Sequence, residues 1–206
     1  MQNKDLKVGA IVLAAGASRR MGQSKMLLPW SETTVVGKVV QTLLEVGIVD
    51  PVVVTGRSFD EIHTVLADYS VKWAHNPQFE TSEMLQSLQI GVRQVSEKLD
   101  AFLVVLGDQP QIESSIVKAI LTEYQLSALP ILIPSFQHRR GHPWLVKKSL
   151  WPDLLALDER ATLRQFLNAH AGEICYLNVD SDSVLMDLDT PEDYARYKSS
   201  ETNGNL

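Results

Sequence analysis

The amino-acid sequence predicts a single α/β domain with three layers, in which helices cover both faces of a doubly wound, mostly parallel β-sheet. Three observations lead to this prediction. The chain has 206 residues, a length that usually folds as one domain around one continuous core. Short runs rich in Val, Ile and Leu recur, and most of them are continuously apolar, as strands covered on both faces are. Helix-like stretches separate these runs, which favours right-handed crossovers between parallel strands.

Strands and helices are expected to alternate through the first two thirds of the chain. The strands are predicted at residues 8–13, 51–55, 71–75, 101–106 and 131–136, and the helices at residues 34–46, 59–67, 84–99 and 114–126. Apolar residues recur at intervals of three and four along the third of these helices, which places them on one helical face. They are Leu85, Leu88, Val92, Val95 and Leu99.

The pattern of the chain changes after residue 137. A polar, basic loop at 137–141 leads to a short strand-like run at 144–146, which is followed by helices at 149–157 and 161–170 and a strand at 173–179. A final helix is expected to begin at Pro191, because proline suits the first helical position. We expect the domain to cover residues 1–198 and the last residues, 199–206, to form a disordered tail, since they carry one leucine and no periodicity.

Composition and charge exclude several classes of function. The chain is 45% apolar and 21% charged, with 19 Lys and Arg against 25 Asp and Glu and a net charge of −6. This acidic balance gives the wrong long-range field for nucleic acid or an anionic membrane. The single cysteine, Cys175, allows no internal disulfide, which fits a reducing cytoplasm. We therefore expect a cytoplasmic protein with no nucleic-acid or membrane partner.

The apolar run at residues 8–17 has the length of a signal-peptide core. Its flanks do not suit that function, because Asp5 lies in the supposed basic region and Arg19 and Arg20 follow the run. We interpret it as a buried first strand, since short apolar runs more often belong to a core than to a membrane.

The loop after this first strand carries the strongest indication of a binding site. Its small residues at 14–16 allow a ligand to approach the backbone closely, and amide groups in such a turn can converge on an anion. Arg19, Arg20 and Lys25 add positive charge. Ligands of open α/β sheets bind at the carboxyl ends of strands, where this loop must lie. The loop matches neither a Walker A motif nor G-x-G-x-x-G, so the residues favour a polyphosphate site of another kind, or a solvated turn.

A second candidate is the segment Gly107-Asp108-Gln109-Pro110, directly after the strand at 101–106. A carboxylate at the exit of a buried strand is costly unless a partner compensates its charge. Mg²⁺ would do so, because it favours carboxylate oxygens and substrate phosphates. The alternative is an aspartate that only initiates a turn before proline.

The segment M-D-L-D-T-P-E-D at residues 186–193 also has a purely structural interpretation. Thr190 or Asp189 can cap the final helix, while Glu192 and Asp193 favour the positive end of its dipole.

The first loop contains the longer pattern L-A-A-G-x-S-x-R-M-G-x-x-K, from Leu13 to Lys25. This pattern resembles the signature of the MobA-like nucleotidyltransferases that mature the molybdenum cofactor, most closely the molybdenum cofactor cytidylyltransferases. The resemblance implies a Rossmann-like nucleotidyltransferase fold and a loop that wraps a nucleoside triphosphate, which Arg20 and Lys25 neutralise. It also implies that Asp108, in G-D-x-P, binds the metal.

Three further segments resemble the same family. Residues 187–193 are similar to D-x-D-T-P-E-D, so the second metal ligand would be Asp187 or Asp189, and we favour Asp189 because a residue at the turn can project toward the site. Residues 76–88 resemble a segment that borders the nucleobase and ribose, with Glu83 where glycine is usual. Residues 140–143 resemble the R-G-H-P segment near the acceptor substrate, and their cations suit a phosphorylated pterin.

Together these implications predict a Mg²⁺-dependent nucleotidyltransferase that transfers CMP from CTP to the terminal phosphate of molybdopterin or molybdenum cofactor and releases pyrophosphate. CTP is preferred because the loop reads Ala14-Ala15-Gly16, where the guanylyltransferases have L-A-G-G. The alternatives are a guanylyltransferase or sugar-phosphate nucleotidyltransferase of the same fold, or a non-catalytic cofactor carrier for a xanthine dehydrogenase-type molybdoenzyme. The expected catalytic residues are Lys25, Arg20 and Asp108; those for the nucleotide are Leu13, Ala14, Ala15, Gly16, Ser18, Arg20, Lys25, Asn76, Ser87 and Gly107; those for the metal are Asp108 and Asp189; and those for the acceptor are Arg140, Gly141 and His142.

Overall fold

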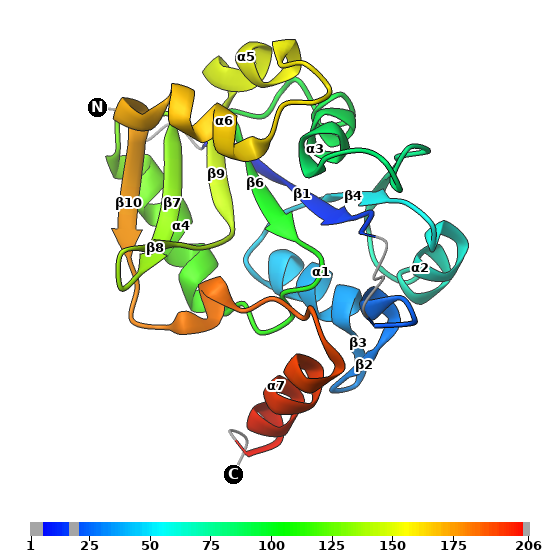
Figure 1. The fold of residues 1–206 in the computed structure, drawn as a ribbon. Helices are drawn as coiled ribbons and strands as arrows, with labels where there is room; N and C mark the ends of the chain where they lie inside the picture. Colours follow the sequence, from blue (N-terminus) through cyan, green and yellow to red (C-terminus); the bar gives the residue numbers. More distant parts are fainter. Residues whose placement is uncertain (1–5, 17–20, 204–206) are drawn as a thin grey trace.

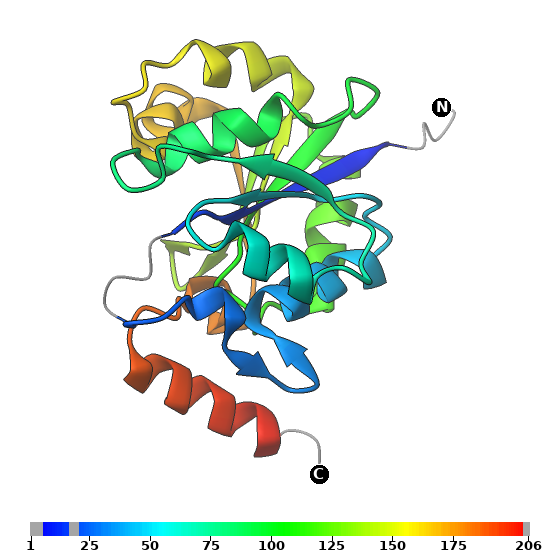
Figure 2. The same ribbon diagram turned by 90° about the vertical axis from the view of Figure 1, so that its right-hand side faces the viewer.

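A β-sheet with helices on both faces forms the body of the molecule (Figures 1 and 2), as seen in a computed structural model that describes residues 6–16 and 21–203. The strands of the sheet lie in the order β10-β7-β9-β6-β1-β4-β5, and β8 pairs with β7. Along this order every pair is parallel except the two that β9 forms with β6 and β7. The prediction of an α/β fold with a mostly parallel sheet is therefore confirmed.

The elements of the described chain have the following bounds. The strands are β1 (Val8–Ala14), β2 (Pro29–Trp30), β3 (Thr33–Thr34), β4 (Val52–Thr55), β5 (Lys72–His75), β6 (Ala101–Leu106), β7 (Ile131–Phe136), β8 (Arg139–Arg140), β9 (Trp144–Lys147) and β10 (Ile174–Asn178). The α-helices are α1 (Val35–Glu45), α2 (Phe59–Val65), α3 (Met84–Val92), α4 (Ser114–Leu126), α5 (Trp151–Ala156), α6 (Leu163–Ala169) and α7 (Pro191–Asn203). The 3₁₀ helices are η1 (Lys25–Leu27), η2 (Lys148–Leu150), η3 (Ala171–Glu173) and η4 (Asp182–Leu185).

Two large apolar clusters fill the spaces between the layers. Because side chains alternate along a strand, Val12 of β1 belongs to the cluster that includes α1, α2 and α4, while Ile11 belongs to the cluster that includes α3, α5 and α6. Both side chains are fully buried. This two-sided burial explains why the strand sequences are continuously apolar.

Several predicted helix ends differ from the structure by one or two residues, and the end of α3 differs most. α3 ends at Val92 rather than at residue 99, and a turn at Arg93 and Gln94 follows it directly. In the next turn the backbone N–H of Lys98 donates a hydrogen bond to the Ser96 side-chain oxygen at 3.2 Å. Val95 and Leu99 still pack against the same core, so the apolar spacing continues beyond the helix. The final helix, α7, begins at Pro191 as predicted and ends at Asn203, whereas the domain boundary at residue 198 stays a prediction. No helix in residues 6–16 and 21–203 is long and apolar enough to span a membrane.

The sheet register brings the two predicted loops together. β1 and β6 are parallel neighbours, and Leu13 lies beside Leu106. The small-residue loop after β1 and the segment that begins at Gly107 therefore leave the sheet side by side. The backbone N–H of Gly107 donates a hydrogen bond to the Leu13 carbonyl at 3.0 Å, and a Cβ atom at residue 107 would lie only 3.0 Å from that carbonyl.

Candidate active site

A cavity of about 350 Å³ lies at the carboxyl ends of β1 and β6, a volume in the range of small-molecule sites. Segments from far apart in the sequence form its walls. The lining residues are Leu13, Ala15, Gly16, Lys25, Met26, Phe79, Ser82, Glu83, Met84, Ser87, Leu106, Asp108, Asp187 and Asp189. Many of the predicted site residues therefore share one cavity, which is charged where the loops after β1 and β6 meet the segment before α7.

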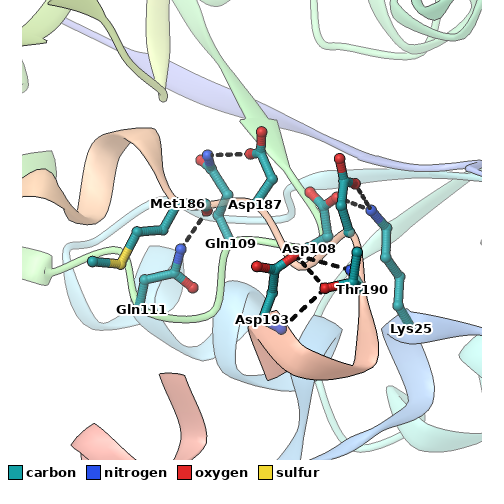
Figure 3. A network of polar contacts seen from close by, with 9 residues as sticks. Lys25, Asp108, Gln109, Gln111, Met186, Asp187, Thr190 and Asp193 are labelled. Carbon is teal, nitrogen blue, oxygen red and sulfur yellow. Dashed lines mark hydrogen bonds and ion pairs between the residues drawn. The ribbon is translucent and has the colours of Figure 1, made fainter. Parts of the chain in front are cut away.

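Lys25 connects two of the predicted acidic segments (Figure 3). Its ammonium group forms an ion pair with Asp108 Oδ2 and another with Asp189 Oδ1 at 3.1 Å. The side chains of Lys25 and Asp108 are 12% and 14% exposed, whereas that of Asp189 is 53% exposed. Burial alone would lower the pKa of Lys25, but the two carboxylates raise it above its ordinary value. Lys25 therefore carries a positive charge at neutral pH.

Asp187 also lines the cavity but has a different partner. The Gln109 side-chain amide, which is buried, donates a hydrogen bond to Asp187 Oδ1 at 2.8 Å (Figure 3). Burial and the negative charge of Asp108 raise the pKa of Asp187. The hydrogen bond keeps the Asp187 carboxylate fixed beside Asp108, while Asp189 faces Lys25. Both aspartates of the motif are thus placed at the cavity.

The donor set is compatible with a hard divalent cation. Within residues 6–16 and 21–203, no group of three His, Cys, Asp or Glu side chains is arranged to hold a metal ion by itself. The carboxylates of Asp108, Asp187 and Asp189 nevertheless line one cavity. Mg²⁺ is usually bound in this way, by one or two carboxylates together with water and substrate phosphates. The residues present therefore fit a metal that shares its ligands with a bound phosphate.

The segment between β5 and α3 also lines the cavity, through Phe79, Ser82 and Glu83. Asn76 is buried and does not line the cavity; its amide nitrogen donates to the hydroxyls of Ser82 and Ser87, each at 2.9 Å. Its side-chain oxygen accepts from the Gln78 backbone N–H at 2.9 Å. Asn76 therefore connects Ser82, in the loop, to Ser87, in α3, and both serines line the cavity. Glu83 has φ −72°, an ordinary value, so glycine is not required there.

Several lining residues were not predicted from the sequence, and Phe79 is the largest of them. Its approach depends on Gly56, because a Cβ atom at residue 56 would lie 2.7 Å from both the Ala15 carbonyl and the Phe79 Cβ. The only sequence signal is the glycine directly after a buried strand, which can mark a close approach of two chain segments. Met26, Ser82 and Leu106 also line the cavity.

The remaining predicted residues have other surroundings. Ala14 belongs to the apolar core, and Gly107 does not line the cavity. Ser18 and Arg20 lie outside the described residues.

The predicted acceptor residues do not line this cavity. Arg140 is exposed, and its Nε donates to the Tyr176 hydroxyl at 2.9 Å. Gly141 is required by packing, since a Cβ atom there would lie 2.5 Å from the Val184 Cβ. The His142 ring stacks on Trp144 with ring centres 4.4 Å apart, and its buried Nδ1 has no hydrogen-bond partner among the described residues. The acceptor role of these residues stays a prediction.

His142 makes stability depend on pH. Burial lowers the pKa of its imidazole to about 4, although a hydrogen bond with the Val104 backbone acts in the opposite direction. Between pH 6.5 and about 4 the unfolded chain binds a proton at His142 that the folded chain does not, so the free energy of unfolding falls as the pH falls. Urea denaturation at pH 7 and pH 5 should show a smaller loss in His142→Phe than in the wild type. Equal losses in the two proteins would contradict the assignment.

A mostly parallel sheet with helices on both faces, and a cavity at its carboxyl edge lined by small residues, a lysine and aspartates, define a Rossmann-like α/β protein whose site suits a phosphorylated ligand. A family model described as the MobA-like NTP transferase domain matches residues 10–174. The chain belongs to this family.

Two relatives and one solved structure illustrate the similarity. The molybdenum cofactor cytidylyltransferase of Escherichia coli (strain K12) is 28% identical over 196 residues, which cover 95% of this chain and 97% of that protein. The purine catabolism protein PucB of Bacillus subtilis (strain 168) is 27% identical over 192 residues, which cover 89% of this chain and 92% of that protein. The structure of Rv0371c from Mycobacterium tuberculosis H37Rv, in complex with manganese, has a TM-score of 0.79 at 23% identity and covers 94% of this chain and 99% of that chain.

Proposed function

We propose that this nucleotidyltransferase transfers CMP from CTP to the terminal phosphate of a molybdopterin-type acceptor and releases pyrophosphate. The observation that carries the proposal is the Lys25 ammonium group, which contacts Asp108 and Asp189 in a cavity whose walls include Ala15 and Gly16. A cation beside small residues suits a polyphosphate, and paired carboxylates suit its accompanying divalent cation. This arrangement favours a metal-bound nucleoside triphosphate as substrate.

The chemistry requires no general base from the protein. The acceptor phosphate oxygen forms a bond to the α-phosphorus of CTP, the bond between that phosphorus and the β-phosphate oxygen breaks, and pyrophosphate leaves. A phosphate monoester is mostly dianionic at neutral pH, since its second pKa is about 6. Catalysis then depends on positioning and on neutralising phosphate charge. Lys25 supplies a fixed positive charge, and Arg20 is proposed to supply a second.

Mg²⁺ is the proposed metal, held by Asp108 and Asp189, with Asp187 as the alternative to Asp189. When bound, it would neutralise charge on the phosphate oxygens. Manganese in the Mycobacterium tuberculosis protein is compatible with a divalent cation in this fold.

The choice of CTP and of the acceptor is supported by two similarities. The loop reads Ala14-Ala15-Gly16, and a relative that covers nearly the whole chain is a molybdenum cofactor cytidylyltransferase. Arg140, Gly141 and His142 are proposed to contact the acceptor phosphate. A cytoplasmic location and delivery of the product to a client molybdoenzyme complete the proposal.

Pyrophosphate release from CTP, GTP and ATP, with molybdenum cofactor as acceptor, tests this function. With the cofactor present, we expect pyrophosphate release from CTP but not from GTP or ATP. Release with GTP would instead support a guanylyltransferase, and release from CTP only when a sugar phosphate replaces the cofactor would support the corresponding sugar-phosphate enzyme. Cofactor binding without pyrophosphate release from any nucleotide would contradict the catalytic proposal and favour a carrier.

A further inference from the structure

A third apolar cluster lies apart from the two that fill the layers of the fold. We call it the hairpin–α7 cluster. Its buried members are Leu28, Trp30, Val35 and Leu188, against which Met21, Tyr194 and Tyr197 pack. The cluster joins the β2–β3 hairpin and the start of α1 to α7. Both ribbon views show α7 beside this hairpin and away from the central sheet (Figures 1 and 2).

Tyr194 holds α7 against the hairpin by several contacts. Its ring lies 6.2 Å from the Trp30 ring, centre to centre, and its hydroxyl donates a hydrogen bond to the Pro29 carbonyl. The Lys198 ammonium group donates to the same hydroxyl at 3.0 Å. Trp30 is only 1% exposed, so the contact partner of Tyr194 is itself fixed.

The first turn of α7 is also fixed by its own side chains. The backbone N–H and the hydroxyl of Thr190 both donate to Asp193 Oδ2 at 2.9 Å, and the Asp193 backbone N–H donates to the Thr190 hydroxyl at 3.1 Å (Figure 3). This reciprocal pattern fixes the chain where it enters the helix. Asp189 is the residue immediately before this cap, so its backbone position follows that of α7.

Both partners of the Lys25–Asp189 ion pair lie close in sequence to buried members of the cluster. Leu188, which is fully buried, directly precedes Asp189. Leu28, 7% exposed, follows η1, and its backbone N–H donates to the Lys25 carbonyl at 3.3 Å. Lys25 and Asp189 are separated by 164 positions in the sequence. The cluster is thus the packing contact that joins their two chain segments.

We propose that the hairpin–α7 cluster positions Asp189 against Lys25 and Asp108, with Tyr194 as its principal positioning residue. The inference rests on the proposed function, because it assigns α7 a part in assembling the phosphate and metal end of that site. Tyr194 acts through Asp189 and is not among the residues that line the cavity. Loss of its ring would release α7 from Trp30 while the two large cores stay packed.

The test compares Tyr194→Ala with Tyr194→Phe in the full-length protein. Tyr194→Ala is expected to lower kcat for pyrophosphate release by about 10- to 100-fold, the size of effect that a displaced catalytic group has, while KM for CTP changes by less than about threefold. Tyr194→Phe keeps the ring on Trp30 and should retain most of the activity. Tyr124 is a buried tyrosine of α4, outside the hairpin–α7 cluster, and Tyr124→Ala therefore controls for a general loss of stability.

Two further measurements separate this proposal from the proposed function. Hydrogen exchange should increase in Tyr194→Ala at residues 186–198 and also at residues 25–30, but not in β1 or β6, whether or not the protein turns over CTP. When Asp189→Asn is already present, adding Tyr194→Ala should lower kcat by less than about a further twofold. Both changes remove the same contribution, the positioned Asp189 carboxylate, so their effects on kcat should not add. Faster exchange in α7 with kcat unchanged, or faster exchange confined to α7, would overturn the positioning role. If the wild type released no pyrophosphate, but Tyr194→Ala still exchanged faster at both residues 186–198 and residues 25–30, the result would count against the proposed function alone.

Discussion

Replacing Asp108 by asparagine is expected to reduce pyrophosphate release by at least about 10³-fold, a loss comparable with that of a major charge-stabilising group in phosphoryl transfer. Asp108 is the predicted metal ligand, and its side chain lines the cavity and is only 14% exposed. An amide of the same shape removes the negative charge that would hold Mg²⁺. The fold should persist, because Lys25 keeps its ion pair with Asp189 at 3.1 Å. Steady-state assays over a range of Mg²⁺ concentrations measure the loss.

Asp180→Asn is the matched control, since Asp180 is exposed and does not line the cavity. It should retain wild-type turnover. Urea denaturation of both variants checks that the fold is intact. Turnover of Asp108→Asn close to that of the wild type, at saturating Mg²⁺, would show that Asp108 is not the metal ligand.

Replacing Lys25 by methionine is expected to lower kcat/KM for CTP by at least about 10²-fold. Methionine keeps an unbranched stem but removes the one positive charge that the described residues place in this cavity. The raised pKa of Lys25 means that this charge is present throughout the neutral pH range. Lys25→Arg should recover only part of the activity, because a planar guanidinium and a compact ammonium group differ in shape and hydration.

Lys118→Met, at an exposed position of α4, controls for the loss of a lysine charge elsewhere. If Lys25→Met bound and turned over CTP within about threefold of the wild type, the charge-neutralising role would be wrong. A second effect should accompany the loss of activity. The positive charge of Lys25 lowers the pKa of Asp187, so the pKa of Asp187 should rise further when the ammonium group is removed.

Most of the fold was predictable because burial in a three-layer sheet is periodic in sequence. β6, β7 and α4 have the predicted bounds. β6 is apolar throughout, β7 begins with an apolar run, and the apolar residues of α4 recur at helical spacing. The end of α3 was predicted too late, because Val95 and Leu99 pack on the core from a turn and continue the helical spacing by coincidence. The antiparallel direction of β9 has no signature in its residues, since a strand buried on both faces is apolar in either direction.

Residues of the candidate site could be predicted only where their possible role follows from the residue types of a single short segment. The loop after β1 and Asp108 were predicted from charge and from small residues at strand ends, which are local features. Phe79 and Gly56 were missed, because their importance depends on a close approach of two loops. The sequence left Asp187 and Asp189 as alternatives, and the structure gives each a different contact: Gln109 for Asp187 and Lys25 for Asp189.

The sequence by itself determined the family, the α/β class and the loop that suits a polyphosphate, because each depends on residue type and spacing over a short stretch of chain. The tertiary structure alone decided which distant groups meet. Lys25 reaches Asp108 because β1 and β6 are parallel neighbours, and it reaches Asp189 because the apolar side chains of the hairpin–α7 cluster pack together. Such contacts between distant segments depend on the total packing of apolar surface, which no single motif encodes.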